Sequence, residues 1–96
     1  MRSRVRFGRS EAEILAVQAL TYLAADESRL ARFFALTGLD PGTIRTAAAS
    51  PGFLSAVLDH VAGDERLLLA FAEASDIAPE AVMAAQRLLA PSEPLE

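Results

Sequence analysis

The residues that could carry out chemistry are few, and they do not form a known catalytic or metal-binding set. His60 is the only histidine and follows Asp59, but a metal ion there would need further ligands, and without cysteine those could only be carboxylates. Two carboxylate pairs, Asp26–Glu27 and Asp64–Glu65, lie where helices are predicted to begin, so helix capping accounts for them. No serine lies in a Gly-x-Ser-x-Gly nucleophile motif. We therefore expect a protein that is not an enzyme, with no catalytic residues, no metal site and no cofactor.

The basic residues are distributed unevenly along the chain. From residue 10 onward there are thirteen acidic residues and five arginines, which leaves this part with a net charge of −8. Such an acidic body repels phosphate backbones and anionic membranes. Contacts with a polyanion are therefore expected, if anywhere, at the four N-terminal arginines, for which a solvated flexible arm is the alternative interpretation. These are Arg2, Arg4, Arg6 and Arg9.

The length and composition predict one folded domain. A chain of 96 residues, of which 52% are hydrophobic, can form one core. The absence of cysteine excludes disulfides, and no stretch reaches the ~20 apolar residues of a membrane helix. We expect three parts: a flexible basic arm over residues 1–9, a helical domain over 10–90, and a disordered tail over 91–96, in which Leu95 and Glu96 resemble tag residues.

Helix-forming residues and helix boundaries predict an all-α fold. Alanine and leucine dominate the sequence and are the strongest helix formers, and no run alternates between apolar and polar residues. A capping box at Ser10–Glu13 predicts a helix over about 11–25, and Asp26 and Gly38 are expected to bound a second helix. We expect five or six short helices in one compact bundle, the later ones over about 40–49, 51–62, 64–75 and 79–90.

Two parts of the sequence resemble each other. When the sequence is aligned with itself so that Asp26 pairs with Asp64, eight of the 36 pairs that begin at positions 15 to 50 are identical. We call this pairing the repeat alignment; its identical pairs include the two Asp-Glu starts, Phe33 with Phe71, and Pro41 with Pro79. We predict two three-helix units, over about 11–49 and 50–90, related by a pseudo-two-fold axis. The alternative is that any Asp-Glu-capped helix followed by a turn produces this likeness.

Residues 30–49 have the pattern of a helix-turn-helix, with Gly38 in the turn. Phe34, however, stands where close crossing of two helices needs alanine. The second helix would offer one cation, Arg45, and one anion, Asp40. We therefore expect no sequence-specific binding to DNA.

A series of spaced motifs runs along the chain: Asp26-Glu27, Leu30-x-x-Phe33, Thr37-Gly-Leu-Asp-Pro41, Phe53-Leu54, Val57-Leu58-Asp59, Asp64-Glu65 and Leu68-x-x-Phe71. The series covers residues 11–90 and resembles the small helical proteins of alphaproteobacteria classed as domain of unknown function 3572. The resemblance implies a bacterial, cytoplasmic helical domain, and it brings no activity, ligand or catalytic residue.

The favoured function is a non-enzymatic helical module that acts through protein–protein contacts, with an unknown partner or by self-association. Motifs for catalysis are missing, and the high apolar fraction of so short a chain predicts an exposed apolar patch. One alternative is a nucleic-acid-associated protein that uses the N-terminal arginines and the helix-turn-helix-like segment. A binder of small molecules in the helical core is a third hypothesis. No membrane contact is expected.

Overall fold

The computed structural model describes residues 8–38, 42 and 51–90, and within these residues it contains five α-helices and no strand. The all-α prediction is confirmed, and each described helix begins and ends within two residues of its predicted bounds. The helix predicted over 40–49, the arginines at positions 2, 4 and 6, and residues 91–96 lie outside the described residues. The helices are α1 (Arg9–Ala24), α2 (Glu27–Thr37), α4 (Pro51–Ala62), α5 (Glu65–Ser75) and α6 (Pro79–Leu89).

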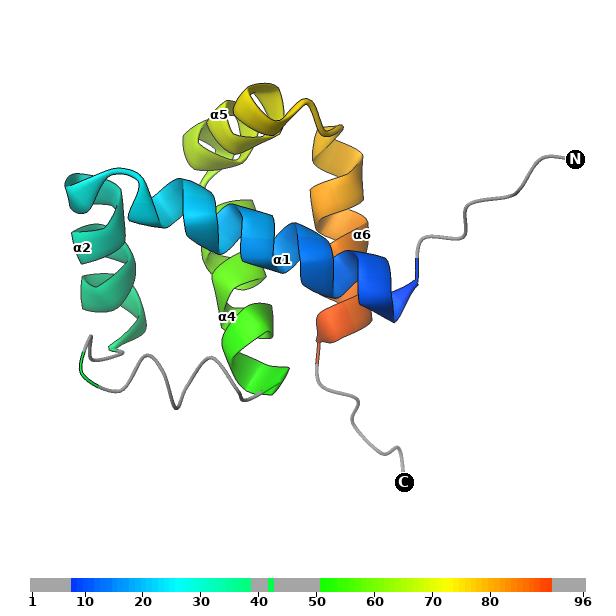
Figure 1. Ribbon diagram of the computed structural model, residues 1–96, viewed down its shortest axis with the longest axis horizontal. Coiled ribbons are helices and arrows are strands. Elements are labelled where there is room, and N and C mark those ends of the chain that lie inside the picture. The colour runs from blue at the N-terminus through cyan, green and yellow to red at the C-terminus, as the bar shows by residue number, and fades with distance from the viewer. Residues whose placement is uncertain (1–7, 39–41, 43–50, 91–96) are drawn as a thin grey trace, which may run out of the picture.

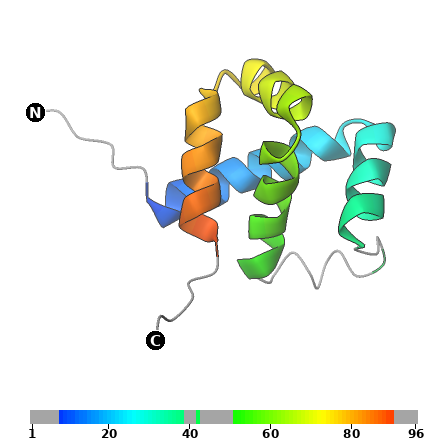
Figure 2. The same ribbon diagram turned by 180° about the vertical axis from the view of Figure 1, so that it is seen from behind.

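Helix α1 crosses two helices, α4 and α6, which lie side by side behind it (Figure 1). The opposite view has α4 and α6 in front of α1 (Figure 2). Helix α1 packs most extensively against α6 and then against α4. Helix α2 packs at the C-terminal end of α1, and α5 packs against both α4 and α6. The core therefore lies between α1 on one side and α4 and α6 on the other.

The core consists of aliphatic and aromatic side chains from all five helices. Its largest fully buried members are Phe33 of α2 and Phe71 of α5. The repeat predicts equivalent core positions for these two phenylalanines, and both are 0% exposed. The other core residues are Ala12, Leu15, Ala16, Ala19, Leu23, Phe53, Val57, Leu58, Val61, Val82, Ala85 and Leu89.

The predicted Asp-Glu starts of α2 and α5 cap these helices. A side-chain oxygen of Asp26 accepts hydrogen bonds from the backbone N–H groups of Ser28 (2.8 Å) and Arg29 (3.2 Å). Asp64 accepts one from the backbone N–H of Leu67 at 3.2 Å. A carboxylate at this position satisfies N–H groups that have no partner within the helix and also favours the positive end of the helix dipole. Capping therefore explains both carboxylate pairs, as predicted.

The start of α1 differs from the prediction. The helix begins at Arg9, with Gly8 as its N-cap, so the capping box predicted at Ser10–Glu13 is wrong. The backbone N–H of Gly8 donates to the Glu11 carboxylate at 2.9 Å. This pair has the same spacing as the predicted Ser10–Glu13 pair, shifted two residues towards the N-terminus. The Arg9 guanidinium also donates to the carbonyl oxygen of Leu88 at 3.1 Å, and this contact attaches the first turn of α1 to α6.

Several pairs of the repeat alignment agree in burial and in helix ends. Residues 15, 19 and 23 of α1 are buried, and so are their counterparts in the repeat alignment, residues 53, 57 and 61 of α4. Helices α2 and α5 both end at a residue in the left-handed conformation: Gly38 has φ +77° and Asp76 has φ +57°. The repeat alignment pairs these two positions as well.

Aromatic contacts between the two units are reciprocal. Phe33 of the first unit lies 5.1 Å from the ring of His60 in the second unit. Phe71 of the second unit lies 5.6 Å from the ring of Tyr22 in the first. The repeat alignment pairs Phe33 with Phe71 and Tyr22 with His60. Such an exchange of equivalent contacts is what a two-fold relation between the halves produces.

Candidate functional site: the outer face of the first helix

His60 lies in the packing between α4 and α2. Its ring is edge-on to Phe33, and its buried Nε2 has no hydrogen-bond partner among the described residues. Burial lowers the pKa of His60, the nearby Arg32 guanidinium lowers it further, and the Asp64 carboxylate acts in the opposite direction. The ring is therefore neutral at pH 7. A histidine held in this way against a phenylalanine has the environment of a packing residue.

The carboxylates near His60 are used in structure. Asp59 accepts a hydrogen bond from the Gln86 side chain of α6 at 2.9 Å, which ties α4 to α6. In the part of the chain that the structure describes, no three His, Cys, Asp or Glu side chains lie close enough to hold a metal ion.

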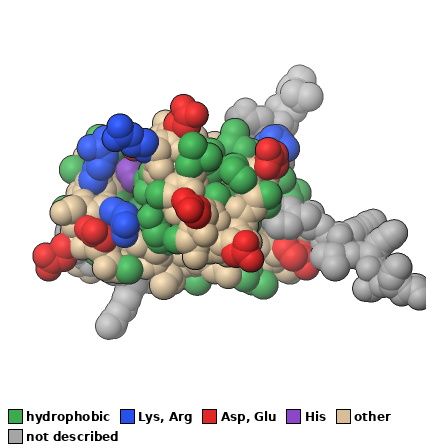
Figure 3. Space-filling model, turned by 90° about the horizontal axis from the view of Figure 1, so that it is seen from above, with side chains coloured by type: hydrophobic (Ala, Val, Ile, Leu, Met, Phe, Trp, Pro, Cys, Tyr) green, Lys and Arg blue, Asp and Glu red, His purple; other side chains and the backbone are tan. Residues whose placement is uncertain are grey.

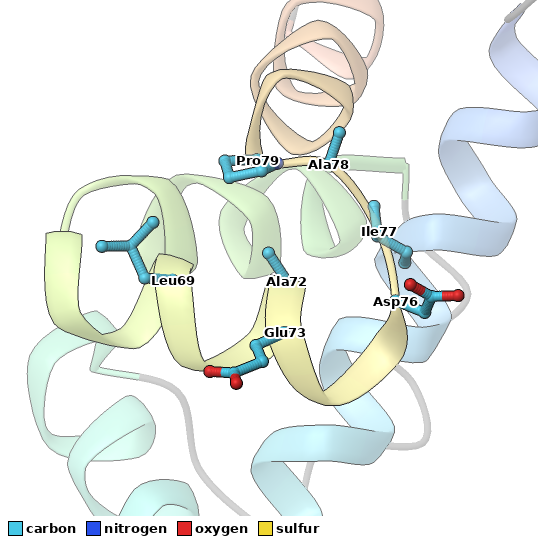
Figure 4. Close-up of a pocket in the computed structure, with 7 residues that line it drawn as sticks. All are labelled: Leu69, Ala72, Glu73, Asp76, Ile77, Ala78 and Pro79. Atoms are coloured by element: carbon cyan, nitrogen blue, oxygen red, sulfur yellow. The ribbon is translucent and has the colours of Figure 1, made fainter.

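A groove of about 500 Å³ lies at the turn between α5 and α6. Two of its residues are acidic, Glu73 and Asp76. Their carboxylates point in different directions in Figure 4, so they do not form the close pair that acid–base catalysis requires. The groove is lined by Leu69, Ala72, Glu73, Asp76, Ile77, Ala78 and Pro79.

Helix α1 is apolar on two opposite sides. The side that faces α4 and α6 buries Ala12, Leu15, Ala16, Ala19 and Leu23. On the other side, Ile14 is 60% exposed and Val17 is 50% exposed. Helical periodicity places the two sets on different sides, because residues at intervals of three and four share a face.

Two apolar grooves flank these exposed residues. One groove of about 550 Å³ lies between α1 and Leu54 in the first turn of α4, and the other, of about 340 Å³, lies between α1 and the end of α5. Val17 and Gln18 line both grooves, so the two form one continuous surface along the helix. We call this surface the α1 outer face and define it by the α1 residues and the adjoining Ala25 that line the grooves: Ser10, Glu13, Ile14, Val17, Gln18, Thr21, Tyr22 and Ala25.

Each end of the α1 outer face carries an ion pair. At the N-terminal end, Glu11 and Glu13 lie in the first turns of the helix, and Glu13 pairs with Arg9 at 3.8 Å. At the C-terminal end, the Arg29 guanidinium pairs with the Asp26 carboxylate at 3.9 Å and lies 4.2 Å from the centre of the Tyr22 ring. Its side chain is 36% exposed, so this cation borders the groove that Tyr22 lines.

The arginines proposed for polyanion contacts are not brought together in the described residues. Of the four, only Arg9 is described, and its guanidinium contacts Leu88 and Glu13. On the face that Figure 3 displays, basic side chains lie near both ends, more of them beside the histidine, and acidic side chains are spread over the whole face. The helix-turn-helix-like segment lies largely outside the described residues, which end at Gly38 and resume, apart from Gly42, at Pro51.

The sequence predicted an exposed apolar patch but not its position. Ile14 and Val17 belong to a helix that is apolar around most of its circumference, and from the sequence alone either side could have been the buried one. The pattern that could have located the patch is the spacing of Ile14, Val17 and Thr21, which forms a second stripe beside the buried one.

Comparison with protein families gives a match over nearly the whole chain. The model of the family described as "Protein of unknown function (DUF3572)" matches residues 9–92. The chain belongs to the DUF3572 family. Since no function is assigned to DUF3572, membership establishes the family and leaves the function unknown. Comparison with curated proteins and with solved structures gives no match. Among the described residues of this DUF3572 member, no helix has the length and hydropathy needed to cross a membrane.

Proposed function

We propose that this DUF3572 protein is a non-enzymatic helical module that acts through protein–protein contacts made by the α1 outer face. The observation that carries the proposal is the exposure of Ile14 and Val17, at 60% and 50%, between two apolar grooves. Contiguous apolar surface on a small protein, bordered by polar groups, is typical of a binding site for another protein. The proposed location is the bacterial cytoplasm, which rests on the family resemblance alone.

The fold has no need of these exposed side chains. Helix α1 is already anchored by five fully or nearly fully buried residues and by the hydrogen bond from Arg9 to α6. Complete burial of an aliphatic side chain contributes about 1.5–3 kcal/mol. Because Ile14 and Val17 are each about half exposed, a partner that covered them would gain roughly 1 kcal/mol from each. By the same area arithmetic, each of these two residues can contribute about as much to binding as it contributes to folding.

The chemistry of the described side chains supports a role without catalysis. The buried histidine packs against Phe33, and the capping and bridging carboxylates are hydrogen-bonded. The larger of the two grooves beside α1 contains one ionisable group, Glu13, which fits an apolar contact surface with a polar border better than a reaction site.

The test is site-specific photo-crosslinking in cells of the native host. A benzophenone amino acid replaces Val17 in one variant and Leu36 in a matched control, because Leu36 is a large apolar residue of α2 with 63% exposure, away from the α1 outer face. We expect protein adducts from position 17 and not from position 36. Absence of adducts at position 17, or equal adducts at both positions, would overturn the proposed function.

A further inference from the structure

We propose that the groove at the turn between α5 and α6 binds a segment of another protein in which one aliphatic side chain lies between two basic residues. This α5–α6 groove has a volume of about 500 Å³ and is lined by residue 69 and residues 72–73 and 76–79. It shares no lining residue with the two grooves beside α1. The proposal therefore goes beyond the proposed function and gives the chain a second contact surface.

The repeat provides an internal reference for the α5–α6 groove. Helices α2 and α5 correspond without a gap in the repeat alignment, and each ends at a residue in the left-handed conformation. Phe34 of α2 pairs with Ala72 of α5. Phe34 packs against the core, with its ring centre 5.7 Å from that of Phe33. Ala72 offers only a methyl group at the corresponding position and lines the groove, so the second unit is open where the first carries an aromatic ring.

Three other lining residues, in α5 and at its C-terminal end, carry more than the fold requires. They are a leucine and two acids, whereas their counterparts in the first unit are small and uncharged. Leu69 is 48% exposed, and Asp76 has φ +57°, a conformation that glycine adopts without strain. Because alanine and glycine suffice in the equivalent helix, contact with another molecule explains these side chains better than folding does. The pairs are Leu69 with Ala31, Glu73 with Ala35, and Asp76 with Gly38.

The two acids of the groove determine the chemistry of its partner. The side-chain carboxylates of Glu73 and Asp76 are exposed and make no hydrogen bond or ion pair within the part of the chain that the structure describes. They point in different directions (Figure 4), so they present two separate places for a cation. Two basic residues can occupy these places while an apolar side chain between them contacts Leu69 and Ala72. Such a segment complements both the charge and the apolar lining of the groove.

The first experiment titrates short peptides into the full chain and follows the backbone amide shifts by NMR. The probe is the blocked pentapeptide Gly-Arg-Leu-Arg-Gly. One control, Gly-Glu-Leu-Glu-Gly, reverses the charges, and the other, Gly-Arg-Gly-Arg-Gly, lacks the apolar side chain. We expect the probe to bind with a Kd of about 1 mM and to shift residues 69–79, and each control to bind at least about fivefold more weakly. Raising the salt from about 50 mM to 500 mM should weaken the binding, because the carboxylates are exposed.

The second experiment converts the groove into its counterpart in the first unit. The triple variant Leu69→Ala/Glu73→Ala/Asp76→Gly introduces the residues of positions 31, 35 and 38, so it should fold and lose at least about fivefold in affinity for the probe. The matched control Leu36→Ala/Glu27→Ala removes an exposed apolar side chain and an exposed acid from α2 and should bind like the natural chain. Circular dichroism and thermal melting check that both variants are folded.

Several results would overturn this proposal. The probe could cause no shifts up to about 5 mM, a control peptide could bind as tightly as the probe, or the triple variant could keep the natural affinity. If the probe binds only after Arg2, Arg4 and Arg6 are replaced by serine, the chain's own N-terminal segment occupies the groove, and a separate partner is overturned. None of these results concerns the α1 outer face, which crosslinking from position 17 tests independently.

Discussion

The reciprocal aromatic contacts predict that the two core phenylalanines contribute similarly to stability. Phe33 and Phe71 are both 0% exposed, so truncation of either to alanine removes a large apolar side chain and leaves a cavity. The expected cost is about 3–5 kcal/mol for each variant. A domain of this size has a total stability of roughly 5–10 kcal/mol, and each kcal/mol shifts the melting temperature by about 4–8 °C. Both variants should melt at least ten degrees lower than the natural chain.

A sharper form of this prediction uses the pairing of the rings. Phe33 contacts His60, and Phe71 contacts Tyr22. Milder leucine substitutions keep the variants folded, so double-mutant cycles can be measured by urea unfolding. We expect coupling energies of about 0.5–1.5 kcal/mol within each contacting pair. The crossed pairs, Phe33 with Tyr22 and Phe71 with His60, serve as controls and should couple by less than about 0.5 kcal/mol.

Two results would refute this reasoning. If Phe71→Ala were nearly neutral while Phe33→Ala unfolded the chain, the two units would not be equivalent in the core. If the crossed pairs coupled as strongly as the contacting pairs, the coupling would report general loosening of the bundle and not the specific exchange of contacts between the units.

Three further predictions concern helix ends and pH. Asp26→Ala should cost about 1–2 kcal/mol and Asp64→Ala about 0.5–1 kcal/mol by urea unfolding, because Asp26 accepts two backbone hydrogen bonds and Asp64 accepts one. Gly38→Ala should destabilise by about 1 kcal/mol, whereas Asp76→Gly should stabilise by about 0.5 kcal/mol, since both positions have positive φ; equal signs in thermal melts would contradict this. Because the pKa of His60 in the folded chain lies below its ordinary value of 6.5, the unfolded chain binds more protons just below that pH. Its contribution to stability is therefore complete above about pH 6.5 and is lost as the pH falls towards the folded pKa. The difference between the unfolding midpoints of the natural chain and His60→Gln should be constant from about pH 7.5 to 6.5. Between about pH 6.5 and 5 the difference should change, because only the natural chain loses this contribution.

The helix boundaries were predictable because they depend on local interactions. Asp26 and Asp64 cap helices through groups two or three residues away, and Gly38 ends α2 through its own backbone conformation. The start of α1 was not predictable in the same way. Two glutamates, Glu11 and Glu13, each lie three residues after a residue that can serve as an N-cap, and the choice between them involves Leu88 of α6, which is 79 residues from Arg9.

The candidate site was harder to predict because exposure is decided by tertiary packing. Ile14 and Leu15 are adjacent aliphatic residues in one helix, yet Ile14 is 60% exposed and Leu15 is 5% exposed. Only the placement of α4 and α6 against one side of α1 separates them. The aromatic exchange between the units was similarly hidden, because Tyr22 and His60 are chemically unlike and their equivalence follows from the repeat and not from residue identity.

The repeat also shows that folding does not explain the apolar residue at position 17. The repeat alignment pairs Val17 of α1 with Ser55 of α4, and the burial of the two residues is reversed relative to their polarity. The serine is 5% exposed, while the valine is 50% exposed. Core formation alone would favour the opposite assignment, because valine is the residue that gains from burial. A half-exposed valine, at a position whose buried counterpart is serine, can contribute as much again when another surface covers it. Val17→Ser should therefore lower the melting temperature only slightly while it weakens binding at the α1 outer face.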